Sequence, residues 1–458
     1  MHWTKSDTAA DTDTGGSEAQ VNGWAASSVR YLLLSLYWFP ISLFWGMMLG
    51  QILPARVSDF SGAAREGGFL GVISVVGASA SAIIQLVIGP ISDHFRSRLG
   101  RRRPFLICGT LVAITAMLGF GYSRSFAELT VCYFLIQLFL NIANGPYVAY
   151  MPDLVARKHH GAASAFMGLM QLLGKAGGPL VAGLAVAHAM APYAHLATPA
   201  AEHAASIARL AAFRYLLRLD AAIFLVCLIV TIVALPDPPA QSSTSSLDAV
   251  RSVFRWDVRS NANFFRLLGS RGVYNVGFYV ALAYLQFYVQ DSLGLGLGYA
   301  DALKNLQIFT IGGALISTFP AGILADRISK KTVVYGSCAF SAAATIVFAL
   351  THSVSTAYAM AVSFGVGYGA FCAVDWAFAC NLLPEGSPAK FMAIWSLSDT
   401  IPQILAPAFG PIADLVNRQV GRGAGWRAAM LVASASVLLG AVAIRTVQES
   451  PTQMKGST

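Results

Sequence analysis

The sequence predicts an all-α membrane protein made of twelve transmembrane helices, arranged as two six-helix pseudo-repeats. Of its 458 residues, 56% are hydrophobic and only 12% are charged, whereas soluble domains carry about a quarter charged residues. Apolar stretches of about 20 residues, the length that crosses a bilayer, recur along the whole chain. A short charged motif also occurs twice, about half a chain apart.

Each predicted span is an apolar stretch that ends near proline, glycine or charged residues. Pro54, Pro104, Pro152, Pro236 and Pro384 mark such ends, because proline interrupts a helix. The predicted spans are 31–53, 69–91, 104–121, 126–151, 161–187, 214–235, 264–290, 302–325, 331–351, 355–381, 390–416 and 426–447.

A long polar segment, 236–263, divides the spans into two halves, 31–235 and 264–447. Either a short helix lying in the membrane interface or an ordinary solvated linker fits its composition. Residues 1–30 and 448–458 are polar, and we expect both to be cytoplasmic tails. The first of these tails lacks the apolar core of a signal peptide.

Lysine and arginine gather in alternate loops, which predicts the orientation of the chain. The loops after the second, fourth, sixth and eighth spans are rich in these residues, so we expect them, and both termini, to face the cytoplasm. The net charge of +9 therefore belongs to loops beside a lipid bilayer, and nucleic acid is not an expected partner. A multi-pass protein of a bacterial inner membrane or a plasma membrane is predicted. Arg418, Arg422 and Arg427 lie on the opposite side and do not fit this pattern.

The repeated motif joins a glycine, an aspartate one helical turn later and a basic stretch. Gly89 and Asp93 precede the basic residues 101–103, and Gly322 and Asp326 precede a second basic stretch. The glycine is expected to allow close helix contact, while the carboxylate accepts from a guanidinium group or a helix N-terminus. Internal repeats of this kind are typical of carriers. The predicted conformational gate comprises Gly89, Asp93, Arg101, Arg102, Gly322, Asp326 and Arg327.

The segment from Gly89 through Gly100-Arg-Arg-Arg-Pro-Phe resembles the signature loop of major facilitator carriers. Its lengthened form resembles that of the plant sucrose transporters and their animal and bacterial relatives, near the glycoside–pentoside–hexuronide group. Segments 44–54 and 144–154 are similar as well. The resemblance implies the major facilitator fold, in which spans 1, 4, 7 and 10 line a central cavity, and a sugar-like substrate. Val148 stands where the plant proteins have arginine, so the resemblance does not single out sucrose.

Ionisable residues inside predicted spans are candidates for substrate binding or ion coupling. Lys175, with Gln171 one turn before it, lies in the fifth span, and Asp375 and Asp399 lie in the tenth and eleventh. Each such residue costs roughly 3 kcal/mol on insertion scales, so it usually has a function. A proton or substrate pathway and a static ion pair between helices both fit. Asp153, near the cytoplasmic end, fits either coupling or a gate.

Neutral polar and aromatic side chains in the spans suit a sugar. Gln137, Asn141 and Asn144 recur at intervals of four and three residues, which places three amides on one helical face. Amides bind sugar hydroxyls and aromatic rings stack on the apolar face of a pyranose. Packing between helices is the alternative role for each of them. The further candidates for this site are Trp45, Trp376 and Gln286.

The sequence contains no motif of an enzyme or a primary pump. A nucleophile elbow, a Walker loop, a His-Glu-x-x-His zinc motif and a dinucleotide-binding glycine pattern are all missing. The six cysteines have neither metal-ligand nor disulfide spacing, so no cofactor is expected. A sensor is disfavoured because the tails are too short for a signalling domain.

A secondary transporter is therefore expected, with proton-coupled symport of a sucrose- or maltose-like glycoside by alternating access as the preferred function. Sodium coupling, facilitated diffusion and efflux remain alternatives. Residues 174–183 resemble the glycine–proline motif of proton-linked exporters, which favours efflux. The identity of the substrate and the oligomeric state do not follow from the sequence.

Overall fold

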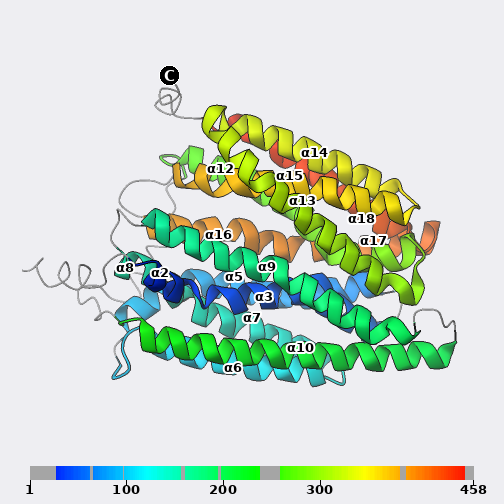
Figure 1. Ribbon diagram of the computed structural model, residues 1–458, viewed down its shortest axis with the longest axis horizontal. Helices are drawn as coiled ribbons and strands as arrows, with labels where there is room; N and C mark the ends of the chain where they lie inside the picture. Colours follow the sequence, from blue (N-terminus) through cyan, green and yellow to red (C-terminus); the bar gives the residue numbers. More distant parts are fainter. Residues whose placement is uncertain are drawn as a thin grey trace, which may run out of the picture.

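The computed structural model describes residues 27–61, 65–95, 97–155, 160–193, 198–237, 258–381 and 388–448. Throughout these ranges the regular structure is helical and no strand is present, which confirms the predicted all-α class. Figure 1 shows long helices lying side by side in one elongated bundle. The predicted linker or interfacial helix within 236–263 falls mostly outside the described residues.

The first half of the chain forms one side of the bundle, which lies lower in Figure 1. Its first span is bent by 42° between α2 and the helices that follow. The elements are α2 (Ser28–Ser35), α3 (Trp38–Met47), η1 (Met48–Ile52), α4 (Leu53–Ser61), α5 (Glu66–His94), α6 (Arg103–Tyr122), α7 (Phe126–Val148), α8 (Tyr150–Leu154), α9 (His160–Met190), η3 (Ala191–Tyr193) and α10 (Pro199–Ala234).

The second half forms the other side. A π turn interrupts its first span at η4, as another π turn, η1, interrupts the first span of the first half. The elements are α12 (Ala262–Phe287), η4 (Tyr288–Ser292), η5 (Gly296–Gly298), α13 (Tyr299–Arg327), α14 (Lys330–Leu350), α15 (Val354–Asn381), α16 (Pro388–Leu405), η6 (Pro407–Phe409), α17 (Gly410–Val420), α18 (Ala424–Ala443) and η7 (Ile444–Thr446).

Eight helices within the described ranges are long and apolar enough to cross a membrane, and a ninth span results if the bent pair of the first span is counted. The predicted ranges 264–290, 302–325 and 390–416 are also helical, but α12, α13 and α16 are not among the eight. The structure is thus consistent with twelve spans. One boundary differs: α10 begins at Pro199 rather than at residue 214, because the preceding alanine-rich segment has high helix propensity.

Small residues set the distance between α3 and α9. A Cβ atom on Gly174 would lie 2.7 Å from the backbone nitrogen of Leu43, and one on Gly178 would lie 2.9 Å from that of Met47. Close backbone approach at small residues is how membrane helices pack without a hydrophobic driving force. The glycine–proline segment 174–183 therefore has a packing role inside the first half.

The two halves meet closely at one end of the bundle, which we call the closed end; it contains α4, the start of α5, η6 and α17. A Cβ atom on Gly67 of α5 would lie 2.7 Å from the carbonyl oxygen of Gly410 in α17. The backbone amides of Gly67 and Gly68 donate to the Asp414 carboxylate at 3.2 and 2.8 Å. A carboxylate from the second half thus binds the N-terminus of α5, where the helix dipole favours negative charge.

The arginines that did not fit the charge pattern bind to groups near the closed end. Arg422 donates to the Asp291 carboxylate at 2.9 Å. Arg427 donates at 2.9 Å to the carbonyl oxygens of Ala349 and Ser292. These contacts join α18 and the segment before it to η4 and to the end of α14, so Arg422 and Arg427 have a structural role.

We expect Gly174→Ala to destabilise the protein, because the added methyl group would press on the backbone of α3 with little room to move. Overpacking of this kind lowers the free energy of unfolding by about 1–3 kcal/mol. The apparent melting temperature in detergent measures the change. Gly168→Ala, in the same helix with no atom within 4 Å of the added Cβ, is the control and should leave that temperature equal or higher. Equal melting temperatures for the two variants would contradict the packing argument.

Candidate functional site

A buried arginine on α12 holds two carboxylates from two other helices. The Nε atom of Arg271 lies 2.7 Å from the Oδ2 atom of Asp375 on α15. One of its terminal nitrogens lies 2.9 Å from the Oδ2 atom of Asp399 on α16. The side chains of Arg271 and Asp375 are only 11% and 12% exposed, while that of Asp399 is 36% exposed. We call Arg271, Asp375 and Asp399 the charge network.

Further contacts fix the orientation of the network. The Arg271 guanidinium also donates to the hydroxyl of Ser398, and it lies over the ring of Trp395 with its central carbon 4.7 Å from the ring centre. Asn275, one turn along α12, donates at 3.0 Å to the Asp399 carboxylate. The guanidinium is therefore held on its edge by carboxylates and on its face by an aromatic ring, as its planar shape allows.

The network contains two carboxylates and one guanidinium, so its charges do not balance when both acids are ionised. The positive charge of Lys175 acts on Asp375 from α9, which belongs to the other half. Lys175 is itself exposed on α9, and Gln171 one turn before it is partly buried. Arg271, which the sequence analysis did not select, thus joins two of the predicted ionisable candidates, Asp375 and Asp399, and a third, Lys175, acts on Asp375 from the other half.

Neutral amides gather on the first half, opposite the charge network. Asn141 on α7 accepts from the Gln85 amide at 2.7 Å and donates to the hydroxyl of Ser81 at 2.8 Å. Gln137 donates to the hydroxyl of Tyr133 at 3.1 Å. Asn144 is partly buried, and its Oδ1 atom has no hydrogen-bond partner among the described residues. We call Gln85, Gln137, Asn141 and Asn144 the amide cluster.

One hydrogen bond joins the amide cluster to α16. The hydroxyl of Thr400 donates at 3.0 Å to the side-chain carbonyl of Gln85. Thr400 directly follows Asp399, so the amide cluster and the charge network meet at two consecutive residues of α16.

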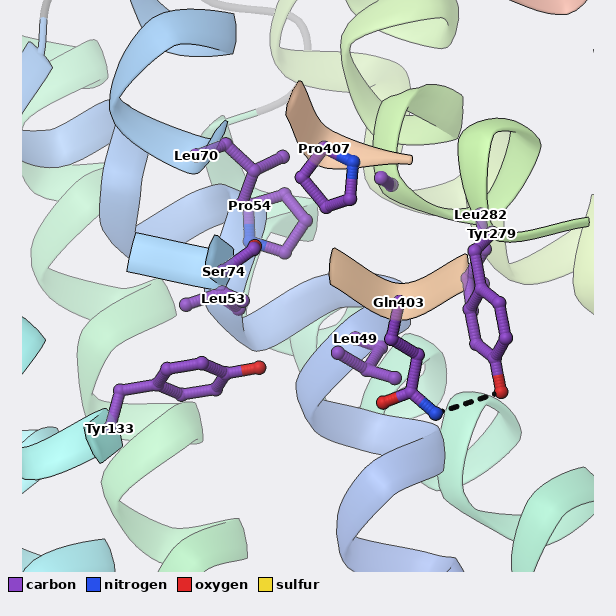
Figure 2. A pocket seen from close by; sticks show the side chains of 11 residues that line it. Leu49, Leu53, Pro54, Leu70, Ser74, Tyr133, Tyr279, Leu282, Gln403 and Pro407 are labelled. Atoms are coloured by element: carbon purple, nitrogen blue, oxygen red, sulfur yellow. Dashed lines mark hydrogen bonds between the residues drawn. The ribbon is translucent and has the colours of Figure 1, made fainter. Parts of the chain in front are cut away.

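A small pocket lies between the halves, toward the closed end from the charge network, and Figure 2 shows the side chains that line it. Its wall is mainly apolar, and the side chains of Tyr133, Tyr279 and Gln403 bring polar atoms to it. Gln403 donates to the hydroxyl of Tyr279 at 3.0 Å, as the dashed line in Figure 2 marks. Such a wall suits a ligand with both apolar faces and hydroxyl groups. The lining residues are Leu49, Leu53, Pro54, Leu70, Ser74, Tyr133, Tyr279, Leu282, Ala283, Gln403 and Pro407.

Two predicted candidates lie in packed surroundings instead. Trp45 packs edge-on against Phe44, with ring centres 5.0 Å apart, and approaches Tyr133 at 6.4 Å. Gln286 on α12 is 1% exposed, and its amide nitrogen has no partner within the described part of the chain. Neither residue lines the pocket. The side chain of Trp376, a third candidate, is outside the described part.

At the end of the bundle opposite the closed end, Asp153 binds two of the predicted gate arginines. Its carboxylate forms ion pairs with Arg101 and with Arg102, the latter at 2.6 Å. Arg102 also donates at 3.2 Å to the carbonyl oxygen of Pro146. Asp237 accepts from the backbone amides of Arg102 and Arg103, at 2.9 and 3.1 Å, at the start of α6. These contacts connect the loop before α6 to the end of α7, to α8 and to the segment that follows α10.

The other predicted gate residues lie on α5 and α13. A Cβ atom on Gly145 of α7 would overlap the side chain of Ile88 and lie 3.8 Å from the backbone nitrogen of Gly89, so α5 and α7 approach closely at these two residues. The surroundings of four gate residues are outside the described part: Asp93, Gly322, Asp326 and Arg327.

Several residues of the site were missed from the sequence. Arg271 is ionisable and falls inside the predicted span 264–290, so the rule that selected Asp375 would have selected it too. The same rule applies to Asp220 on α10, which is 1% exposed and whose carboxylate has no hydrogen-bond partner among the described residues. The roles of Gln85 and Thr400 carry no comparable signal, because single neutral polar residues are common in membrane helices.

Residues 31–407 and 306–458 match the Major Facilitator Superfamily. The chain belongs to this family of transporters, which confirms the resemblance noted above and excludes a membrane enzyme. It is therefore a multi-pass membrane transporter of a small solute. Over 111 residues it is 28% identical to the general alpha-glucoside permease of Schizosaccharomyces pombe strain 972, a match that covers 24% of this chain and 18% of the permease.

Solved structures of other transporters share the fold. A bacterial homologue of the human lysosomal transporter Spinster, in an inward-facing and occupied conformation, matches with a TM-score of 0.66 and 14% identity, over 95% of this chain and 98% of that one. The nucleoside transporter NupG matches with a TM-score of 0.62 and 12% identity, over 92% of this chain and 100% of that one. These similarities concern the fold alone.

Replacing Arg271 with methionine is expected to destabilise the protein by about 3–5 kcal/mol, because two carboxylates would remain inside the membrane without their cation. The double variant Arg271→Met with Asp375→Asn removes one of these charges and should recover part of the loss. Apparent melting temperatures in detergent test both. A double variant that is no more stable than Arg271→Met would argue against the charge explanation.

Asp153→Asn is expected to lower the turnover number of transport more than it changes the half-saturation concentration, because Arg101 and Arg102 would lose an anionic partner at the predicted gate. Initial rates over a range of substrate concentrations give both values. Asp301→Asn is the matched control: Asp301 is 56% exposed and pairs with Lys304 of its own helix, so the loss should be small. Equal effects of the two substitutions would contradict a gating role.

Proposed function

We propose that this transporter carries a sugar or glycoside, sucrose- or maltose-like in size, together with a proton, by alternating access. The observation that carries the proposal is the charge network: Arg271 is shared by two acids inside the membrane while neutral amides face it from the other half. We further propose that both termini are cytoplasmic.

The residues around the pocket and the amide cluster support a sugar as substrate. Asn141 and Gln85 offer donors and acceptors suited to paired hydroxyl groups, and Asn144 has a buried acceptor that lacks a described partner. Tyr133 and Tyr279 supply aromatic surface at the pocket wall. The similarity to an alpha-glucoside permease, although it is confined to 111 residues, favours the same class of substrate.

The charge network supports coupling to a proton. With both acids ionised it carries one excess negative charge, which is costly inside a membrane. A proton on one acid removes that charge and frees part of the Arg271 guanidinium, and Lys175 on the other half can also compensate it when the halves approach. Protonation therefore changes the relative stability of two arrangements of the halves, which coupling requires.

The ends of the bundle support alternating access. The closed end is sealed by backbone packing between α5 and α17, and Asp153 holds Arg101 and Arg102 at the opposite end. A cycle in which these two ends open in turn would expose the pocket to each side of the membrane. We assign Lys175, Asp375 and Asp399 to coupling. Gly89, Asp93, Gly322, Asp326 and Arg327 remain proposed gate residues, together with the arginines bound to Asp153.

Proteoliposomes containing the protein should accumulate radiolabelled maltose or sucrose when the outside is made acidic, and accumulation should stop when a protonophore collapses the gradient. Asp375→Asn should abolish gradient-driven accumulation but keep exchange of labelled for unlabelled sugar, because exchange needs no net proton movement. Asp301→Asn, as above, is the control.

Each alternative has its own result in the same assay. Accumulation that follows a sodium gradient instead would replace the proton by sodium. Equilibration without accumulation would indicate facilitated diffusion, and an acidic outside that drives sugar out of the vesicles would indicate efflux. Wild-type protein that moves neither sugar, while folded, would remove this class of substrate from consideration.

A further inference from the structure

Gln85 uses both ends of its amide to connect the two halves. Its nitrogen donates at 2.7 Å to Asn141 in the amide cluster, and its oxygen accepts at 3.0 Å from the hydroxyl of Thr400 on α16. Asn141 cannot turn freely, since its own nitrogen donates to Ser81 and to the carbonyl oxygen of Gln137, at 2.8 and 2.7 Å. The orientation of the Gln85 amide is thereby fixed by its partners.

Thr400 lies where the hydrogen bond from Gln85 reaches the helix of the charge network. It is 5% exposed and follows Asp399, whose carboxylate binds Asn275 and Arg271. Because consecutive residues share one helix, a shift of α16 at Thr400 also moves the Asp399 carboxylate. The hydroxyl of Thr400 has a second acceptor, the carbonyl oxygen of Ser396 in its own helix, at 3.2 Å. It can therefore leave Gln85 without losing every partner.

We propose that the Gln85–Thr400 hydrogen bond is the contact through which sugar binding on the first half reaches the charge network on the second. The proposal rests on the function proposed above. A sugar hydroxyl that donates to Asn141 competes with the Gln85 nitrogen for the same oxygen. A buried amide without a partner costs about 1–3 kcal/mol, so Gln85 turns toward the sugar and releases Thr400. Gln85 and Thr400 are positioning residues in this scheme.

The release has a defined consequence for the second half. Once Thr400 donates only within α16, the hydrogen bond that held α16 to α5 is lost. Asp399, which Arg271 and Asn275 of the second half bind, can then move with α16 relative to α5. Sugar binding thus loosens the contact between the halves beside the acid that is most exposed in the charge network. A second amide contact between the halves, from Gln51 to Gln307 at 2.6 Å, is not connected to either cluster by a described hydrogen bond.

The first test measures transport by Thr400→Val, which keeps the shape of the side chain but removes the hydroxyl. We expect exchange of labelled maltose or sucrose to stay within about twofold of wild type, while gradient-driven accumulation falls by about fivefold, the factor that one hydrogen bond of about 1 kcal/mol represents. Thr400→Ser should retain accumulation. The control is Thr345→Val: Thr345 is 6% exposed, and its hydroxyl donates to Ser341 of its own helix. Unchanged accumulation in Thr400→Val would overturn the proposal.

The second test needs no sugar. Spin labels on Ala127→Cys and Ser355→Cys, exposed positions at the closed end of the two halves, report the distance between them when the native cysteines are replaced by alanine. Thr400→Val and Gln85→Leu should each raise the ratio of separated to sealed molecules by about fivefold. The double variant should show no more than the larger single effect, because both substitutions remove the same bond.

The two tests separate the failure of this proposal from the failure of the proposed function. Wild-type protein that transports neither sugar would contradict the glycoside assignment, whatever the distances show. An unchanged distance in Thr400→Val would contradict the role of the Gln85–Thr400 hydrogen bond, even in a protein that transports sugar. Additive effects of the two substitutions in the double variant would contradict it as well.

Discussion

The pairing of one buried guanidinium group with two carboxylates is the constraint on which the second half of the protein depends. Arg271, Asp375 and Asp399 come from three different helices, and none of the three charges is tolerable alone inside a membrane. The helices α12, α15 and α16 must therefore stay together around the guanidinium. Small residues also pack α15 closely against α13, where a Cβ atom on Gly369 would lie 2.7 Å from the Cα atom of Ala314.

In the first half, the polar side chains between the helices are neutral. Asn141, Gln85 and Ser81 satisfy one another by hydrogen bonds and need no counter-ion. Such a cluster can exchange one partner for another at a cost of a few kcal/mol, whereas the charge network resists any change that separates its charges. The two halves are thus suited to different tasks, with exchangeable hydrogen bonds on one side of the site and charge compensation on the other.

Much of the fold follows from the sequence because lipid imposes a simple rule: each span must be apolar, helical and about 20 residues long. The two-half arrangement was visible in the repeated Gly–Asp motif, and the family match supports it. The site was less predictable. Asp375 and Asp399 stood out as charges in apolar helices, but their common partner Arg271 was not selected from a span that also contains Arg266, Ser270 and Asn275.

The sequence does not predict which residues of different helices are in contact. The bond from Thr400 to Gln85 joins residues 315 positions apart, and nothing in either neighbourhood indicates the other. The close approach of α5 and α7 at Ile88, Gly89 and Gly145 shows the same limit, since the motif marks Gly89 but neither the partner helix nor Gly145. A motif gives the residue types of a helix contact, but the rotation of each helix decides which residue makes it.

The two π turns have a mechanical meaning of their own. A π turn holds one residue more than an α turn, so its conversion to α-helix would rotate the segment beyond it by about 100° and shift it by about 1.5 Å. Beyond η1 lie Leu53 and Pro54, which form part of the pocket wall, and within η4 lies Asp291, which binds Arg422 and Trp426. Each half therefore contains, in its first span, a point beyond which the helix can rotate about its axis. Such a joint would change which side chains face the substrate without unfolding any part of the membrane-embedded bundle.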